Sequence, residues 1–221
     1  MEDIYFMKAC IFDLDGTLTD TLESLTYSVN KTLGEMDLPP ITADECESFV
    51  GNGARVLMEC SLRAAGEENK DRLEEAMERY GRIFDANCTY HVTPYEGVEE
   101  MLRGLKEKGI RLGVLSNKPH RQTVKVVREI FGENVFDFAQ GQQEQVPRKP
   151  DPAGVLRLLE EMLVTRDECL YVGDSEVDIQ TGRNAGVRTI SVTWGFRTRE
   201  VLVAAGAGTI IDRPEELLRL V

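Results

Sequence analysis

The stretch Lys8-Ala-Cys-Ile-Phe-Asp-Leu-Asp-Gly-Thr17 decides the fold that the sequence predicts. It opens on a short apolar run, which is typical of a strand buried on both faces of a parallel sheet. Two carboxylates, Asp13 and Asp15, follow in a loop at the carboxyl end of that strand. Ligands of open α/β sheets bind at the carboxyl ends of the strands, so this loop is the first candidate for a functional site.

The rest of the chain alternates between strand and helix patterns, with one long exception. Strands are predicted over residues 110–115, 135–139, 169–172, 187–192 and 209–211, with helices between them. This alternation predicts an α/β fold, a Rossmann-like parallel sheet with right-handed crossovers. Residues 19–90 show helical periodicity and no convincing strand. We therefore predict an inserted, small all-helical cap over residues 19–90, on a core formed by residues 1–18 and 91–221.

Composition narrows the class of protein. The 221 residues carry a net charge of −13 and are 42% hydrophobic, which is enough for a buried core. Such an acidic chain is not expected to bind nucleic acid or an anionic membrane. Five dispersed cysteines without a C-x-x-C pair favour reduced thiols in a cytoplasmic protein. The acidic start Met1-Glu2-Asp3 is unlike a signal peptide, and no apolar run approaches a membrane span. We expect a monomer or homodimer.

Polar side chains recur where the predicted strands and loops end. Besides Asp13 and Asp15, this set consists of Ser116, Asn117, Lys149, Asp174 and Asp178. Four carboxylates and one ammonium give a formal charge of −3 in one pocket, which a hard divalent cation such as Mg²⁺ would offset. With Mg²⁺ in place, a hydroxyl and an ammonium can hold phosphate oxygens. The chain's two histidines lie at no predicted strand end, so histidine-based catalysis is poorly supported.

Four segments in order resemble the motifs of the haloacid dehalogenase superfamily, and together they span essentially the whole chain. They are Asp13-Leu-Asp-Gly-Thr-Leu-Thr-Asp20, Leu115-Ser-Asn117, Lys149-Pro-Asp-Pro152 and Gly173-Asp-Ser-Glu-Val-Asp178. The resemblance implies that Asp13 is a nucleophile and Asp15 a general acid and base. It implies phosphate binding by Thr17, Ser116, Asn117 and Lys149, and Mg²⁺ binding by Asp13, Asp15 and Asp174. Asp178 is then expected to orient metal-bound waters or Lys149.

The segment Phe49-Val-Gly-Asn-Gly-Ala-Arg-Val-Leu-Met58 resembles the cap of phosphoglycolate phosphatases. That resemblance implies a Mg²⁺-dependent phosphomonoesterase for a small phosphorylated metabolite, with 2-phosphoglycolate favoured, acting through an aspartyl phosphate. Gly53 and Arg55 are candidate specificity residues. Arg55 either pairs with the substrate carboxylate or is an exposed helix arginine. We expect the cap to close over the substrate, with hinges near residues 18–20 and 88–93.

Other functions fit parts of the same pattern. A sugar phosphomutase, a pyrophosphatase or a nucleotidase of the same superfamily would use the same aspartates. A phospho-acceptor signalling domain is a non-enzymatic alternative, since it is also α/β and also phosphorylated on aspartate. Such domains place the acceptor after a later strand and lack a long helical insert, so the position of Asp13 disfavours them.

Overall fold

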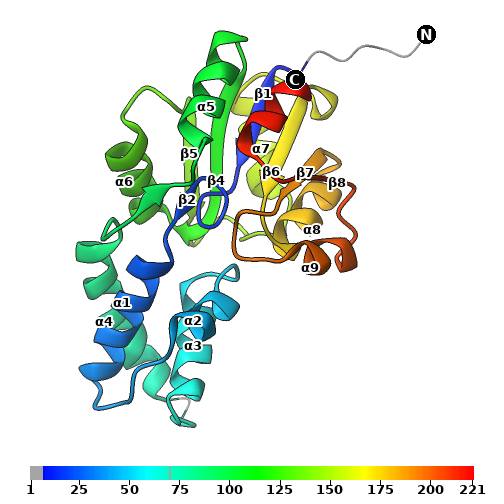
Figure 1. Cartoon of the computed structure of the whole chain (residues 1–221). Coiled ribbons are helices and arrows are strands. Elements are labelled where there is room, and N and C mark those ends of the chain that lie inside the picture. The colour runs from blue at the N-terminus through cyan, green and yellow to red at the C-terminus, as the bar shows by residue number, and fades with distance from the viewer. Residues whose placement is uncertain (1–6, 70) are drawn as a thin grey trace.

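Six parallel strands form the centre of the molecule, which we describe from a computed structural model over residues 7–69 and 71–221 (Figure 1). Residues Met1–Asp3, on which the prediction about a signal peptide rests, lie outside the described residues. The sheet order is β5-β4-β1-β6-β7-β8, with every neighbouring pair parallel. The strands are β1 (Ala9–Phe12), β4 (Arg111–Pro119), β5 (Phe138–Gln142), β6 (Cys169–Gly173), β7 (Arg188–Val192) and β8 (Thr209–Ile211). This sheet confirms the predicted α/β fold.

Strand β1 lies in the middle of the sheet because both of its faces are apolar. Cys10 and Phe12 pack into the core on one side, beneath α5 (Val98–Glu107) and α6 (His120–Phe131). Ala9 and Ile11 pack on the other side, against α7 (Ala153–Glu161) and the end of α8 (Glu176–Ala185). The remaining elements here are α9 (Arg199–Ala204) and the 3₁₀ segments η1 (Arg166–Glu168) and η2 (Pro214–Arg219). The Asp13–Thr17 loop therefore starts from a rigid, central strand.

The helices that follow β1 and precede residue 93 form a helical unit at one end of the sheet (Figure 1). They are α1 (Leu22–Gly34), α2 (Ala43–Phe49), α3 (Ala54–Ala64) and α4 (Arg72–Asn87). Their apolar faces turn inward, as Val29 and Leu33 of α1 and Tyr80 and Phe84 of α4 show by their burial. Among residues 7–69 and 71–221, no helix is long and apolar enough to cross a membrane.

A two-stranded ribbon joins the helical unit to the sheet. β2 (Thr19–Asp20) pairs antiparallel with β3 (Thr93–Pro94) where the chain enters and leaves the unit. The expectation of no strand from residue 19 was therefore wrong. A strand of two residues has no periodicity to read in a sequence, and its pairing depends on a partner more than 70 residues away. Both crossings of the chain thus lie side by side.

Two strands differ from the predicted ranges in ways that matter for the site. β4 continues to Pro119, so Ser116 and Asn117 lie within the strand rather than after it. β5 begins at Phe138, three residues later than predicted. The preceding Asp137 accepts a hydrogen bond from the Leu112 backbone N–H through its side chain, which ends the ladder there. β4 consequently carries its polar residues into the space between sheet and helical unit.

Gly182 in α8 has a packing reason that its sequence context does not reveal. A Cβ atom at this position would lie 1.8 Å from Thr189 Oγ1 on β7. Glycine costs helix stability in a helix interior, yet here it lets α8 approach the neighbouring strand closely. The position of α8 matters because this helix carries Asp178.

Candidate active site

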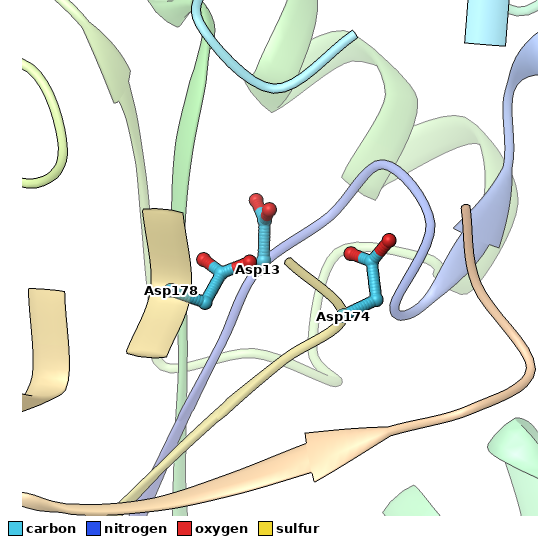
Figure 2. A group of neighbouring side chains, drawn as sticks. All are labelled: Asp13, Asp174 and Asp178. Atoms are coloured by element: carbon cyan, nitrogen blue, oxygen red, sulfur yellow. The ribbon is translucent and has the colours of Figure 1, made fainter. Parts of the chain in front are cut away.

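Three buried carboxylates meet at the carboxyl ends of β1 and β6. Asp13 follows β1, Asp174 follows β6, and Asp178 projects from the first turn of α8 (Figure 2). One carboxylate oxygen from each lies within 4.8 Å of the others. The structure therefore brings together three acidic residues that the sequence assigned to a single pocket.

Lys149 links two of these carboxylates. Its buried Nζ lies 2.9 Å from Asp13 Oδ2 and 2.8 Å from Asp178 Oδ1. Burial alone would lower the pKa of Lys149, but Asp13 and Asp178 together raise it well above its ordinary value. Lys149 is therefore a permanent positive charge at the base of the site.

Asp178 is fully occupied by hydrogen bonds from the protein. Its Oδ1 accepts from Lys149 Nζ and from the Tyr171 hydroxyl at 3.0 Å. Its Oδ2 accepts from the backbone N–H of Ser175 at 3.1 Å and from the Ser175 hydroxyl at 2.5 Å. With both oxygens engaged, Asp178 is suited to orienting Lys149 and less suited to binding a metal ion directly.

Asp174 is held between the first loop and the segment after β7. The Thr17 hydroxyl donates to Asp174 Oδ1 at 2.9 Å, and the Phe196 backbone N–H donates to Oδ2 at 2.9 Å. Gly16, with φ of +85°, makes room for this carboxylate, since a Cβ there would lie 2.4 Å from Asp174 Oδ2. Thr17 was predicted to bind phosphate. In the structure its hydroxyl donates a hydrogen bond to Asp174 instead.

Two of the three predicted metal ligands, Asp13 and Asp174, have side chains that are costly to ionise in their present surroundings. Burial raises the pKa of Asp13 well above its ordinary value, Lys149 opposes this, and Asp178 and Asp174 add to it. Burial, with the charge of Asp178, raises the pKa of Asp174 to about 7. A divalent cation between these two carboxylates would remove that cost, and an oxygen-only donor set suits Mg²⁺. The residues present therefore fit a hard cation.

Ser116 and Asn117 reach the site from β4, and their side chains make different hydrogen bonds. Ser116 Oγ accepts a hydrogen bond from the Lys118 backbone N–H at 3.1 Å and lines the pocket. The Asn117 amide accepts from the Lys149 backbone N–H at 2.8 Å and donates to the Lys149 carbonyl oxygen at 3.1 Å. Asn117 thereby fixes the loop that carries Lys149, and its contact with phosphate stays a prediction.

Lys118 is the site residue that the sequence reasoning missed. Its Nζ lies 2.7 Å from Asp15 Oδ1, and its side chain is 1% exposed. Adding Lys118 to the predicted set gives four carboxylates and two ammonium groups, so the formal charge of that set is −2 rather than −3. The signal was present in the chain: alternation along a strand places residue 118 on the same side as Ser116.

A pocket with about 580 Å³ of space free of protein atoms, part of it open to solvent, lies between the sheet and the helical unit. Asp13, Asp15 and Asp174 line it from the sheet side. The helical unit contributes mostly apolar side chains and one loop, namely Leu25, Val50, Gly51, Gly53, Ala54, Leu57, Tyr80 and Phe84. The pocket combines a charged floor with an apolar roof, as expected for a small anionic ligand.

The two predicted specificity residues lie in different places. Gly53 lines the pocket. The Arg55 side chain is 54% exposed and its guanidinium pairs with Glu74 at 2.5 Å, away from the residues that line the pocket. Arg55 sits in the first turn of α3 and its side chain reaches towards α4. Of its two predicted states, the structure displays the exposed helix arginine.

Three side chains from the part of the chain that contains the sheet donate hydrogen bonds to the loop Val50–Asn52, which we call the docking loop. Arg197 donates from Nη2 to the Val50 carbonyl oxygen at 2.8 Å, and Asn117 donates to that of Gly51 at 3.0 Å. Arg148 donates to the carbonyl oxygen of Asn52 at 2.9 Å. Three successive carbonyl groups of the helical unit thus accept hydrogen bonds from the part of the chain that contains the sheet. These bonds hold the docking loop over the pocket in this structure.

Comparison with known proteins gives a consistent picture. Residues 10–192 match the family model described as haloacid dehalogenase-like hydrolase. The chain is 33% identical to the phosphoglycolate phosphatase of Pseudomonas putida, over 96% of this chain and 78% of that protein. It is 36% identical to a phosphoglycolate phosphatase of Cereibacter sphaeroides, over 96% of this chain and 98% of the relative.

Solved structures share the whole architecture. The crystal structure of a predicted phosphoglycolate phosphatase from Haemophilus somnus aligns with a TM-score of 0.89 at 27% identity, covering 97% of each chain. CbbY from Rhodobacter sphaeroides, solved with phosphate, aligns with a TM-score of 0.80 over 96% of each chain. At 22% identity the second likeness bears on the fold alone.

Proposed function

This chain belongs to the haloacid dehalogenase-like hydrolase family, and from that premise we propose that it is a Mg²⁺-dependent phosphomonoesterase with Asp13 as its nucleophile. One observation carries the proposal. Asp13 lines the pocket and is held by Lys149 at 2.9 Å, while Asp15 stands two residues further along the same loop. The pocket thus offers a nucleophile and a second carboxylate, and a permanent positive charge lies directly behind the nucleophile.

The chemistry follows from the roles that these positions allow. A carboxylate oxygen of Asp13 attacks phosphorus, the ester P–O bond breaks, and Asp15 donates a proton to the departing alkoxide oxygen. Water then attacks the aspartyl phosphate, gives its proton to Asp15, and releases inorganic phosphate and the free Asp13 carboxylate. Lys149 and the Ser116 hydroxyl stabilise negative charge on the phosphoryl oxygens during both steps.

Asp13, Asp174 and the backbone carbonyl of Asp15 would hold the metal ion in this proposal. When bound, Mg²⁺ neutralises charge on the carboxylates and on the phosphoryl group, as it does in phosphoryl transfer generally. The acidic group of Asp13, Asp174 and Asp178 supports a cation here. Asp178 keeps its part as the acceptor that orients Lys149.

The favoured substrate is 2-phosphoglycolate. Relatives at 33% and 36% identity carry the name phosphoglycolate phosphatase, and each alignment covers 96% of this chain. The docking loop and the apolar side chains of α3 and α4 close over the charged floor, so the pocket suits a small ester. We further propose that residues 19–90 act as a cap that opens for exchange of substrate and product.

Steady-state hydrolysis of a panel of phosphate compounds tests this function. The panel contains 2-phosphoglycolate, glucose 1-phosphate, a nucleoside monophosphate, pyrophosphate and p-nitrophenyl phosphate, each with Mg²⁺. We expect the highest kcat/KM for 2-phosphoglycolate. Conversion of glucose 1-phosphate to glucose 6-phosphate would instead indicate a phosphomutase, and a preference for pyrophosphate or the nucleotide would assign those activities.

A further inference from the structure

The pocket contains an ammonium group that the proposed hydrolysis does not require. Lys118 Nζ lies 2.7 Å from Asp15 Oδ1 and 4.9 Å from the centre of the Phe84 ring, which belongs to the helical unit. The Lys118 side chain is almost completely buried, and it lines the pocket. Burying a lysine is costly unless its charge is paired, so this position calls for a partner.

Asp15 satisfies only part of what a buried ammonium offers. An ammonium has three N–H donors, and in the described part of the chain Asp15 is the one carboxylate to which Nζ donates. The face of Phe84 accommodates the positive charge without accepting a conventional hydrogen bond. Lys118 can therefore bind a second anionic oxygen in the pocket while keeping Asp15.

The two other cations at the site, Lys149 behind Asp13 and Arg197 in the pocket lining, are already engaged. Lys149 lies between Asp13 and Asp178 at the floor of the site. Arg197 pairs with Glu176 at 3.2 Å and donates to two carbonyl oxygens of the helical unit. Lys118 is thus the pocket cation best placed to recognise an anionic group of the substrate other than its phosphate.

Its partner Asp15 determines which part of the substrate Lys118 would meet. In the proposed reaction Asp15 faces the ester oxygen, so an ammonium bonded to Asp15 lies on the leaving-group side of the phosphorus. In 2-phosphoglycolate a single CH₂ group separates that ester oxygen from the carboxylate. The carboxylate therefore falls within reach of a donor that already contacts the general acid.

We propose that Lys118 binds the substrate carboxylate and selects phosphate esters that carry a carboxylate one carbon from the ester oxygen. This assignment rests on the proposed function and deepens it. It also gives Lys118 the part that the sequence suggested for Arg55, whose guanidinium is used on Glu74 at the surface. Lys118 is then a specificity-determining residue that contacts both the substrate and Asp15.

Binding of two phosphonates, which cannot be hydrolysed, tests the proposal. 3-Phosphonopropionate has the shape of 2-phosphoglycolate with CH₂ in place of the ester oxygen, and propylphosphonate has a methyl group in place of the carboxylate. We would titrate both by calorimetry, with Mg²⁺ present, into the parent protein and into Lys118→Met, Lys118→Arg and Lys125→Met. Lys125 donates to the Asp85 carbonyl oxygen outside the pocket, so its variant is a matched control for losing one lysine.

We expect the parent and Lys125→Met to bind 3-phosphonopropionate at least about tenfold more tightly than propylphosphonate, which corresponds to about 1.4 kcal/mol. In Lys118→Met this preference should fall below about twofold, while Lys118→Arg should retain part of it because the charge remains. The Arg variant keeps the test informative if Lys118→Met does not fold, because a longer, planar cation in the same place should change the preference measurably.

Two results would overturn the proposal. One is a parent protein that binds both phosphonates equally; the other is a Lys118→Met variant that loses both affinities by the same factor, which would limit Lys118 to holding Asp15. The proposed function fails differently. A parent that hydrolyses no phosphomonoester in the substrate panel would lose the phosphatase assignment, whatever preference it shows between the two phosphonates.

Discussion

The side-chain amide of Asn117, within strand β4, donates to the carbonyl oxygen of Gly51 in the helical unit at 3.0 Å. The same amide accepts from the backbone N–H of Lys149. One side chain thus connects the roof of the pocket to the loop that supplies its permanent positive charge. Closure of the pocket and the placement of Lys149 are consequently linked through a single residue.

Asn117→Ala should loosen the docking loop and lower stability. The variant leaves the buried Lys149 N–H without its acceptor, at a cost of about 1–3 kcal/mol in the free energy of unfolding. Urea unfolding measures that cost, and hydrogen–deuterium exchange should become faster over residues 43–54. Arg148→Gln is the control, because Arg148 is an exposed donor to the next carbonyl oxygen and its loss should change stability by less than about 0.5 kcal/mol. Unchanged exchange in Asn117→Ala would contradict the link.

Asp13→Asn should abolish turnover while the fold is kept, because an amide is a poor nucleophile. Single-turnover mass spectrometry of the parent should show a transient phosphoryl adduct on the peptide that contains Asp13, and the variant should show none. Asp15→Asn should retain more activity on p-nitrophenyl phosphate than on 2-phosphoglycolate, since a good leaving group needs less protonation. An adduct on Ser116 would remove Asp13 from the nucleophilic role.

Metal removal should make stability depend on pH in a defined direction. The pKa of Asp174 is raised to about 7 in the folded protein from an ordinary value of 3.8, so the folded state holds its proton more tightly than the unfolded chain. Stability in EDTA should therefore be greatest near pH 4 and fall as the pH rises towards 7.

Saturating Mg²⁺ should restore stability at pH 7, because the cation replaces the proton as the partner of the carboxylates. Asp174→Asn should reduce the pH dependence measured in EDTA, since an amide does not titrate, and Asp13, whose pKa is also raised, should account for what remains. Melting temperatures across this pH range, with and without Mg²⁺, measure both effects. Full phosphatase activity in excess EDTA would contradict the requirement for a metal ion.

Gly182→Ala should destabilise the protein even though alanine is the better helix former. The added methyl group would lie 1.8 Å from Thr189 Oγ1, so α8 or β7 must shift, at a cost of about 1–3 kcal/mol. Chemical denaturation measures the loss. The double variant with Thr189→Ala removes the clashing oxygen and should recover part of the stability, whereas no recovery would assign the loss to another contact.

Arg55→Ala should change kcat/KM for 2-phosphoglycolate by less than about threefold, because an exposed ion pair contributes little. Parallel kinetics on Lys118→Met should show a far larger loss. A loss of about tenfold or more in Arg55→Ala, confined to substrates with a carboxylate, would support the role that the sequence suggested for Arg55.

Much of the architecture could be predicted from the sequence because each buried parallel strand corresponds to a short apolar run of consecutive residues. The apolar run before Asp13 and the run before Asp174 each predict a strand and its functional end. The order of these runs, with helices between them, determines the sheet type. The two-residue β2 and the start of β5 escaped prediction because their limits depend on partners distant in the chain.

The carboxylate cluster was predictable for the same reason, whereas Lys118 was not identified. A lysine in a sequence is most often an exposed residue, and only three-dimensional packing shows that Phe84 and Asp15 enclose this one. Thr17 and Asn117 illustrate a second limit. Their positions were predicted, but the partners of their side chains, Asp174 and the docking loop, come from remote parts of the chain.

The ribbon formed by β2 and β3 holds together the two ends of the intervening 72 residues, 21–92. In terms of chain entropy, this inserted segment is one very long loop between the strands of the sheet. The entropic cost of closing a loop grows only slowly with its length. Replacing this inserted segment by a shorter or longer one should therefore change the stability of the sheet little. The helical unit can therefore change in sequence and length separately from the sheet that carries Asp13 and Lys118. A graft that preserves Thr19–Asp20 and Thr93–Pro94 should therefore join a different helical unit to this sheet.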